Sequence, residues 1–100
     1  MRKQAVRAAT GLQVISPMIK VLLFGRLGDL HPEKTISIEL SETISTPADV
    51  RHFLSTKNAA LGKALAEPQN LIALNQKISS DDQLLSKGDE LAFLPPVTGG

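Results

Sequence analysis

A single amphipathic helical stretch among short strand-like segments is the feature that most limits the folds open to this chain. It begins at Thr46, whose hydroxyl can accept a hydrogen bond from the Asp49 amide, with Pro47 placed where its missing N–H costs nothing. Apolar side chains then recur at helical spacing until Pro68 ends the pattern, at Val50, Phe53, Leu54, Leu61 and Leu65. Gly62 is the expected point of division between a main helix and a second turn or two. One apolar helix face covering one face of a small sheet is the simplest layered arrangement.

The segments around this helix have strand patterns. Two precede the helix, two follow it and a closing strand comes last, at Ile19–Phe24, Thr35–Leu40, Asn70–Leu74, Lys77–Ser79 and Glu90–Leu94. A tight turn at Asn75-Gln76 joins the third strand to the fourth. Pro95-Pro96 ends the last strand, because proline cannot donate to a β-ladder. The predicted fold class is α+β, in the order ββαββ with a closing strand, a mixed sheet, and one main helix packed on one face.

Strand alternation predicts which side chains face the helix. Those expected to face it are Ile19, Val21, Leu23, Leu91 and Phe93. Those expected on the opposite face are Lys20, Leu22, Phe24, Ala92 and Leu94. Phe24, Ile78 and Leu94 would then form an exposed apolar patch beside the C-terminal tail, and such patches mark protein interfaces. The alternative is that residues 1–17 or crystal packing cover this patch.

Composition excludes several classes of function. The 100 residues include no cysteine, which removes disulfides, thiolate metal sites, iron–sulfur clusters and a cysteine nucleophile. Aromatic residues make up only 3%, which disfavours a nucleic-acid module that stacks bases. His31 and His52 lack further ligands at metal-binding spacing, so we expect no metal site. No apolar stretch approaches the ~20 residues that span a bilayer, so we expect no membrane contact and a soluble, cytoplasmic protein.

Charge is distributed unevenly along the chain. Residues 1–17 hold three basic and no acidic side chains, whereas the rest holds eight basic and ten acidic ones. A mildly acidic body has no electrostatic reason to bind nucleic acid and would suit a partner with a basic groove. Asp81-Asp82 and Asp89-Glu90 are expected to be solvated turn acids, with docking to a basic partner as the alternative. Gly25–Gly28 is expected to be a loop and no phosphate cradle, because no helix start follows it.

The first seventeen residues differ from the rest, and Met18 then opens the strand-like MIKVLLFG. We expect residues 1–17 to be a disordered or non-native N-terminal extension; a targeting segment and an ordered extra turn or strand are the alternatives. Residues 18–94 would form the folded domain. Residues 95–100, PPVTGG, would be an extended, flexible tail.

The tail has only one group that can be activated. Glycines have no side chain, so any reactivity belongs to the Gly100 carboxylate, a poor electrophile until a better leaving group is attached. The prolines stiffen the base of the tail in polyproline II, and the β-branched pair after them can grip a channel. The residues expected to enter a narrow channel in a partner are Pro95, Pro96, Val97, Thr98 and Gly99.

A strand order of this kind ending in FLPPVTGG resembles the ubiquitin-like β-grasp sulfur carriers of the ThiS type. Within them it is most similar to the small subunit of molybdopterin synthase. The matching stretches are MIKVLLFGRL at residues 18–27, ALNQKIS at 73–79 and DDQLLSKGDELAFLPPVTGG at 81–100. The resemblance covers residues 18–100 and is weak between 30 and 70. Its tail is the specific part, because a PPxxGG terminus arises by chance on the order of once in 10⁵ chains.

The resemblance implies that an ATP-dependent, ubiquitin-activating-like adenylyltransferase adenylates Gly100 and that a sulfur donor displaces AMP, which leaves a thiocarboxylate. It implies that the tail then inserts into the large, catalytic subunit of molybdopterin synthase, within a heterotetramer, and gives sulfur to a cyclic pyranopterin phosphate. The protein would thus serve molybdenum cofactor biosynthesis, with no permanently bound cofactor and no catalysis of its own. Because the chain lacks cysteine, any sulfur that it carries must be on the Gly100 carboxyl.

Two other functions remain open. One is a related carrier for thiamine thiazole or tRNA thiolation, or a protein modifier joined to lysines through Gly100. The other is a β-grasp interaction module with an inert tail, since terminal glycines are often without function. A neighbouring gene for the large synthase subunit would favour the first interpretation over both.

Overall fold

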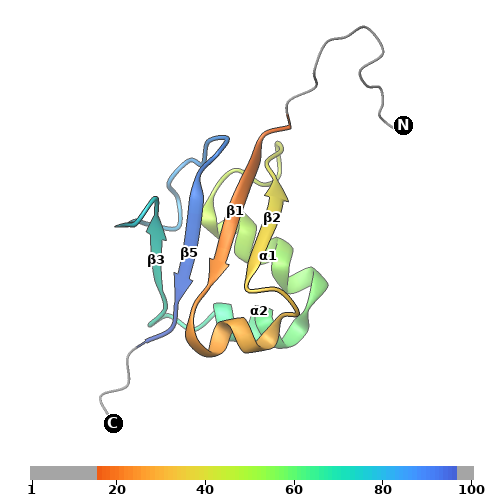
Figure 1. The fold of residues 1–100 in the computed structure, drawn as a ribbon, viewed down its shortest axis with the longest axis vertical. Helices are drawn as coiled ribbons and strands as arrows, with labels where there is room; N and C mark the ends of the chain where they lie inside the picture. The colour runs from red at the N-terminus through yellow and green to blue at the C-terminus, as the bar shows by residue number, and fades with distance from the viewer. Residues whose placement is uncertain (1–15, 97–100) are drawn as a thin grey trace, which may run out of the picture.

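The parallel pair β1 (Met18–Leu23) and β5 (Glu90–Leu94) forms the centre of the sheet in this computed structural model, which describes residues 16–96. Antiparallel strands extend it on both sides, with β2 (Thr35–Glu39) beside β1, and β3 (Leu71–Leu74) and then β4 (Lys77–Ile78) beside β5. The order β2-β1-β5-β3-β4 confirms the predicted mixed sheet (Figure 1). Every predicted strand is present, with its ends moved by no more than one residue.

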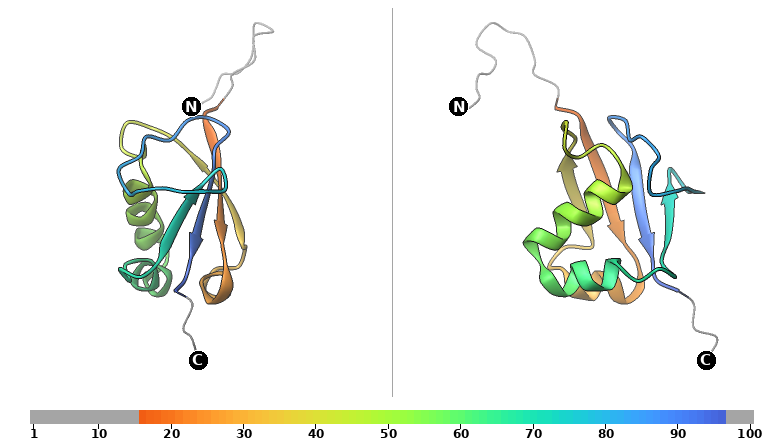
Figure 2. Two further views of the ribbon diagram at one scale, coloured as in Figure 1. Left: turned by 90° about the vertical axis from the view of Figure 1, so that its left-hand side faces the viewer. Right: turned by 180° about the vertical axis from the view of Figure 1, so that it is seen from behind.

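Two helices, α1 (Pro47–Lys57) and α2 (Ala59–Leu65), cover one face of this sheet (Figure 2). The predicted helix start is confirmed, because Thr46 Oγ1 accepts from the Asp49 amide at 3.2 Å and the Asp49 carboxylate accepts from the Thr46 amide at 3.2 Å. The same carboxylate accepts from the Ser45 amide at 3.0 Å. Hydrogen bonds to its ionised form, that from the Ser45 amide above all, lower the pKa of Asp49 below its ordinary value of 3.8.

The helical stretch divides at Asn58, so the expectation that Gly62 divides it is wrong. The Asn58 backbone is extended; its N–H donates to the Leu54 carbonyl at 3.0 Å, where α1 ends. Its side-chain oxygen accepts from the Leu61 amide at 3.0 Å and caps α2. Gly62 instead lies where the two helices approach most closely, since a Cβ built on it would be 2.4 Å from Ser55 Cβ.

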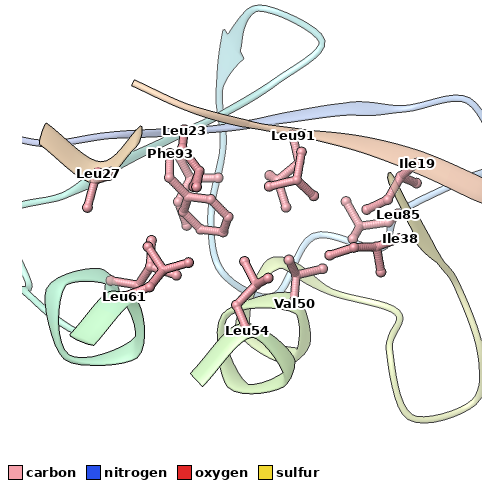
Figure 3. Close-up of a cluster of buried hydrophobic side chains, with 13 residues drawn as sticks. Ile19, Leu23, Leu27, Ile38, Val50, Leu54, Leu61, Leu85, Leu91 and Phe93 are labelled. Carbon is pink, nitrogen blue, oxygen red and sulfur yellow. The ribbon is translucent and has the colours of Figure 1, made fainter. Parts of the chain in front are cut away.

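Apolar side chains from both layers form one buried cluster between the sheet and the helices (Figure 3). The side chains predicted to face the helix are all buried there, namely Ile19, Val21, Leu23, Leu91 and Phe93. The Arg51 guanidinium of α1 lies over the Phe93 ring, 5.6 Å from its centroid, and forms an ion pair with Asp81 at 2.9 Å. Arg51 therefore links α1 to β5 and to the loop before β5.

Two segments predicted to be loops contribute to this core. The segment predicted as the loop Gly25–Gly28 lies within a 3-10 helix, η1 (Gly25–Leu30), whose Leu27 is buried. The polar connection over residues 81–87 contributes Leu85 to the core, whereas the neighbouring Leu84 is exposed. Leu27 and Leu85 lie toward opposite ends of the cluster (Figure 3). Each of these two segments therefore covers one end of the hydrophobic core. Among the described residues, no helix is long and apolar enough to cross a membrane.

We expect Gly62→Ala to lower the free energy of unfolding by about 1–3 kcal/mol, because the new methyl group would overlap the facing helix backbone. A Cβ there would be only 2.7 Å from Ser55 Cα, an atom that cannot rotate away. Urea denaturation measures the change. Lys63→Ala, at the exposed neighbouring position, is the control and should change stability by no more than about 0.5 kcal/mol. An unaltered midpoint for Gly62→Ala would contradict the close helix contact.

The lowered pKa of Asp49 predicts a loss of stability in acid. A carboxyl whose pKa is depressed by folding stabilises the fold above its unfolded pKa of about 3.9, and this contribution is lost as the pH falls through the lower folded value. We therefore expect Asp49→Asn to reduce the difference between the urea midpoints at about pH 7 and about pH 2. Glu67→Gln, at an exposed acid, is the control. If both variants retained the full difference, Asp49 would have no part in the acid sensitivity.

Candidate protein interaction site

The sheet face opposite the helices is covered by no element among residues 16–96 (Figure 2). Strand register arranges its side chains in rows across the strands. The middle row consists of Thr35, Leu22, Ala92, Ala73 and Ile78. The row toward the end of β5 consists of Phe24, Leu94 and Leu71. The row on the other side consists of Ser37, Lys20 and Glu90. This open face is therefore apolar where β5 ends and polar at its other end.

The three residues predicted to form an interface come together around one groove of about 300 Å³ on this face. Phe24 is 46% exposed and Ile78 is 69% exposed, while Leu94 is half-buried. Ala92 also lines the groove, as its predicted outward direction requires, yet it is only 6% exposed. Its short side chain lies in the central strand of the sheet, between Leu22 of β1 and Ala73 of β3. We call Phe24, Ile78, Leu94 and Leu71 the apolar patch; its role as a partner interface is still a prediction.

Leu71 belongs to the apolar patch, although the sequence does not identify it. It is 51% exposed and pairs with Leu94 across the β3–β5 ladder. Its neighbour Ile72 faces the core. Because β3 reads Leu-Ile-Ala-Leu, it is apolar on both faces and has no alternation that could show which side is buried. Only the register with β5 distinguishes the two faces.

The base of the tail lies against the end of β1. The Phe24 amide donates to the Phe93 carbonyl at 3.1 Å, which continues the parallel pairing past the last strand residue of β1. Gly25 follows with a φ of 56°, and a Cβ built on it would be 2.9 Å from Pro95 Cγ. Glycine therefore permits both this backbone turn and the close approach of Pro95. The predicted tail residues Val97, Thr98, Gly99 and Gly100 lie outside the described residues, while Pro96 is half-buried.

At the start of the described chain, Ser16 and Pro17 contact the domain. The Pro17 carbonyl accepts from the Leu40 amide at 2.9 Å, and the Ser16 carbonyl accepts from the Met18 amide at 2.8 Å. These two residues belong to the segment that the sequence assigns to an N-terminal extension. The other residues of that segment, 1–15, lie outside the described part of the chain.

The remaining polar candidates have local partners or face solvent. His31 Nδ1 lies 2.8 Å from the Glu33 carbonyl oxygen, and His52 is exposed on α1. Within residues 16–96, no three side chains of the metal-ligating acidic, histidine or cysteine types come close enough together to hold an ion. The Asp89 carboxylate accepts from the Ser86 amide at 2.7 Å, as a turn acid does. The strongest candidate site in the described chain is therefore a surface for a protein partner.

A comparison of Phe24→Ala with Phe93→Ala tests which of these two side chains faces the core and which lies on the open face of the sheet. Both changes remove the same atoms, but Phe93 is fully buried whereas Phe24 is exposed. We expect Phe93→Ala to destabilise the domain by about 3–5 kcal/mol and Phe24→Ala by less than about 1 kcal/mol, as measured by thermal unfolding. Phe93→Leu provides a milder core variant if Phe93→Ala does not fold. Equal losses at the two positions would contradict the assignment of Phe24 to the open face.

Comparison with known proteins points to one family. The ThiS family matches residues 21–100. The molybdopterin synthase sulfur carrier subunit of Escherichia coli is 37% identical over 83 residues, which are 83% of this chain and 100% of the relative. The subunit of the same name from Haemophilus influenzae is 35% identical over 83% of this chain and all of the relative.

Solved structures agree on the fold. The small archaeal modifier protein 1 of Haloferax volcanii superposes with a TM-score of 0.69 at 21% identity, over 80% of this chain and 98% of that one. Subunit 1 of the molybdopterin-converting factor of Helicobacter pylori was solved in complex with subunit 2. It gives a TM-score of 0.57 at 27% identity, over 83% of this chain and 99% of that one. The mixed sheet with helices on one face is thus the ubiquitin-like β-grasp fold. This chain belongs to the ThiS family, as its C-terminal sequence and strand pattern predict.

Proposed function

We propose that this protein is the sulfur carrier subunit of molybdopterin synthase and acts in molybdenum cofactor biosynthesis. The observation that carries this proposal is the 31–37% identity to three subunits of that name, each matched over its full length. The geometry supports it in a second way. β5 ends at Leu94, a residue of the exposed apolar patch, and Pro95 follows it, so a partner that covers the patch would be next to the start of the tail.

The chemistry requires activation of the Gly100 carboxylate. Its oxygen attacks the α-phosphorus of ATP, and pyrophosphate leaves; a ubiquitin-activating-like adenylyltransferase carries out this step and supplies the catalytic groups. A donor of sulfide-level sulfur then attacks the carbonyl carbon and displaces AMP, so that the terminus becomes a thiocarboxylate. ATP is a substrate of the activating enzyme, and the carrier needs no resident cofactor. Its need for ATP fits a location in the cytoplasm.

The second half of the cycle takes place on the large synthase subunit. The tail, from Pro95 to Gly99, enters the active site of that subunit, while Phe24, Ile78 and Leu94 dock on its surface. The thiocarboxylate sulfur attacks a carbon of a cyclic pyranopterin phosphate and displaces the oxygen bonded there, so that carrier and pterin are joined as a thioester. Water then hydrolyses this thioester at the Gly100 carbonyl, which leaves the sulfur on the pterin and restores the Gly100 carboxylate. Acid–base groups and substrate contacts come from the large subunit, and two copies of each chain would form a heterotetramer.

Intact-mass analysis after incubation with ATP, the activating enzyme and a sulfur source tests the proposal. We expect one oxygen of the protein to be replaced by one sulfur. Deletion of Gly99-Gly100 should abolish this change and leave the melting temperature nearly unaltered, because these residues lie beyond β5. Gly100→Ala should slow the reaction, since a methyl group crowds the carbonyl carbon.

Addition of one residue after Gly100 is the sharpest control, because it moves the terminal carboxyl and leaves the folded domain alone. The extended chain should gain no sulfur. Thiolation of the extended chain at the native rate would contradict the proposal that the Gly100 carboxyl carries the sulfur. Thiolation of the native chain without any sulfur transfer to the pterin by the large subunit would instead favour the thiamine, tRNA or protein-modifier alternatives.

A further inference from the structure

A second groove lies between η1 and α2, outside the apolar patch. It has a volume of about 330 Å³, and its lining residues are Arg26, Leu27, Ala60, Lys63, Ala64, Glu67 and Asn70. Ala60 and Ala64 supply an apolar surface within the groove, above the buried Leu27, and Arg26 and Lys63 are exposed. Within the described chain, neither cation forms an ion pair, since Arg51 with Asp81 is the only such pair there. Both charges are therefore available to an outside partner.

This groove lies at the end of the molecule from which the tail departs. Arg26 directly follows Gly25, the residue against which Pro95 packs. Figure 1 shows η1 and α2 at the same end of the sheet as the C-terminal ends of β1 and β5. A protein that receives the tail must approach this end, so the groove would be close to the contact.

The charged side chains of residues 16–96 can be divided according to the end of the sheet at which their elements lie. The charged residues at the tail end are Arg26, Lys34, Lys57 and Lys63, with Asp29, Glu33 and Glu67. The acidic residues in the other half are Glu39, Glu42, Asp49, Asp81, Asp82, Asp89 and Glu90. The basic residues there are Lys20, Arg51, Lys77 and Lys87. Counted over residues 16–96 alone, four cations and three anions give the tail end a small positive net charge at neutral pH, and four cations and seven anions give the other half a negative one; Arg2, Lys3, Arg7 and the Gly100 carboxylate lie outside this count.

We propose that Arg26 and Lys63 bind an acidic segment of the protein that receives the tail, and that this local attraction speeds the approach of the tail end. The inference rests on the proposed function, which makes the large synthase subunit that receiving protein. An acidic side chain with an apolar stem matches the groove, because the two cations Arg26 and Lys63 outnumber the one anion, Glu67, that also lines it. Attraction between such surfaces mainly raises the association rate and is screened by salt.

Charge reversal at single positions tests this inference. Arg26→Glu and Lys63→Glu each change the net charge by two units at the tail end, and Lys87→Glu makes the same change at the far end. Lys87 directly precedes Gly88, whose amide donates to the Met18 carbonyl at 2.8 Å, so it lies at the start of β1. Binding to the purified large subunit of the same organism is followed by stopped-flow fluorescence, and circular dichroism verifies the fold of each variant.

We expect Arg26→Glu and Lys63→Glu to lower the association rate constant about tenfold at about 0.01 M salt, where the Debye length is about 30 Å. The loss should vanish at about 1 M salt. Lys87→Glu should leave the rate unchanged or raise it. Equal losses for all three variants, or a loss that persists in high salt, would overturn the inference. If the native chain, carrying its thiocarboxylate, failed to bind the large subunit at all, the proposed function itself would fail.

Discussion

The parallel pairing of β1 with β5 is the interaction on which the rest of this structure depends. It joins two segments about seventy residues apart in the chain and places both at the centre of the sheet, where Val21, Leu91 and Phe93 are fully buried. Because the two strands run the same way, they also end at the same place. Gly25 and Pro95 become neighbours for this reason. The core and the candidate site thus arise from one pairing, with the helices covering one face and the apolar patch left on the other.

The elements that the sequence predicts well are those set by local chemistry. The Thr46–Asp49 capping pair needs only neighbouring residues, and the alternation in β1 and β5 reveals which side chains face the helices. From these follow the layers and the patch residues Phe24 and Leu94. Gly25 is informative as well, because glycine directly after an apolar strand is a sign of a tight chain reversal.

The features that the sequence does not reveal depend on contacts between distant segments. Asn58 ends α1 and starts α2 partly because its side-chain amide donates to the Leu30 carbonyl at 2.6 Å, and that contact exists only in the folded chain. The polar connection after β1 forms a 3-10 helix whose Leu27 fills one end of the core, a contact that only the folded chain provides. Composition likewise shows a mildly acidic body but cannot show that most of its acidic residues lie in the half away from the tail.

β4 has only two residues, Lys77 and Ile78, and it forms one edge of the sheet. A sheet edge with free backbone groups can pair with a strand of another molecule. An uncovered apolar face makes such edge-to-edge association more favourable. So short an edge offers too few hydrogen bonds to hold a foreign strand, and the lysine adds charge repulsion between identical copies. β4 would therefore help this protein to remain a monomer while its apolar face is uncovered.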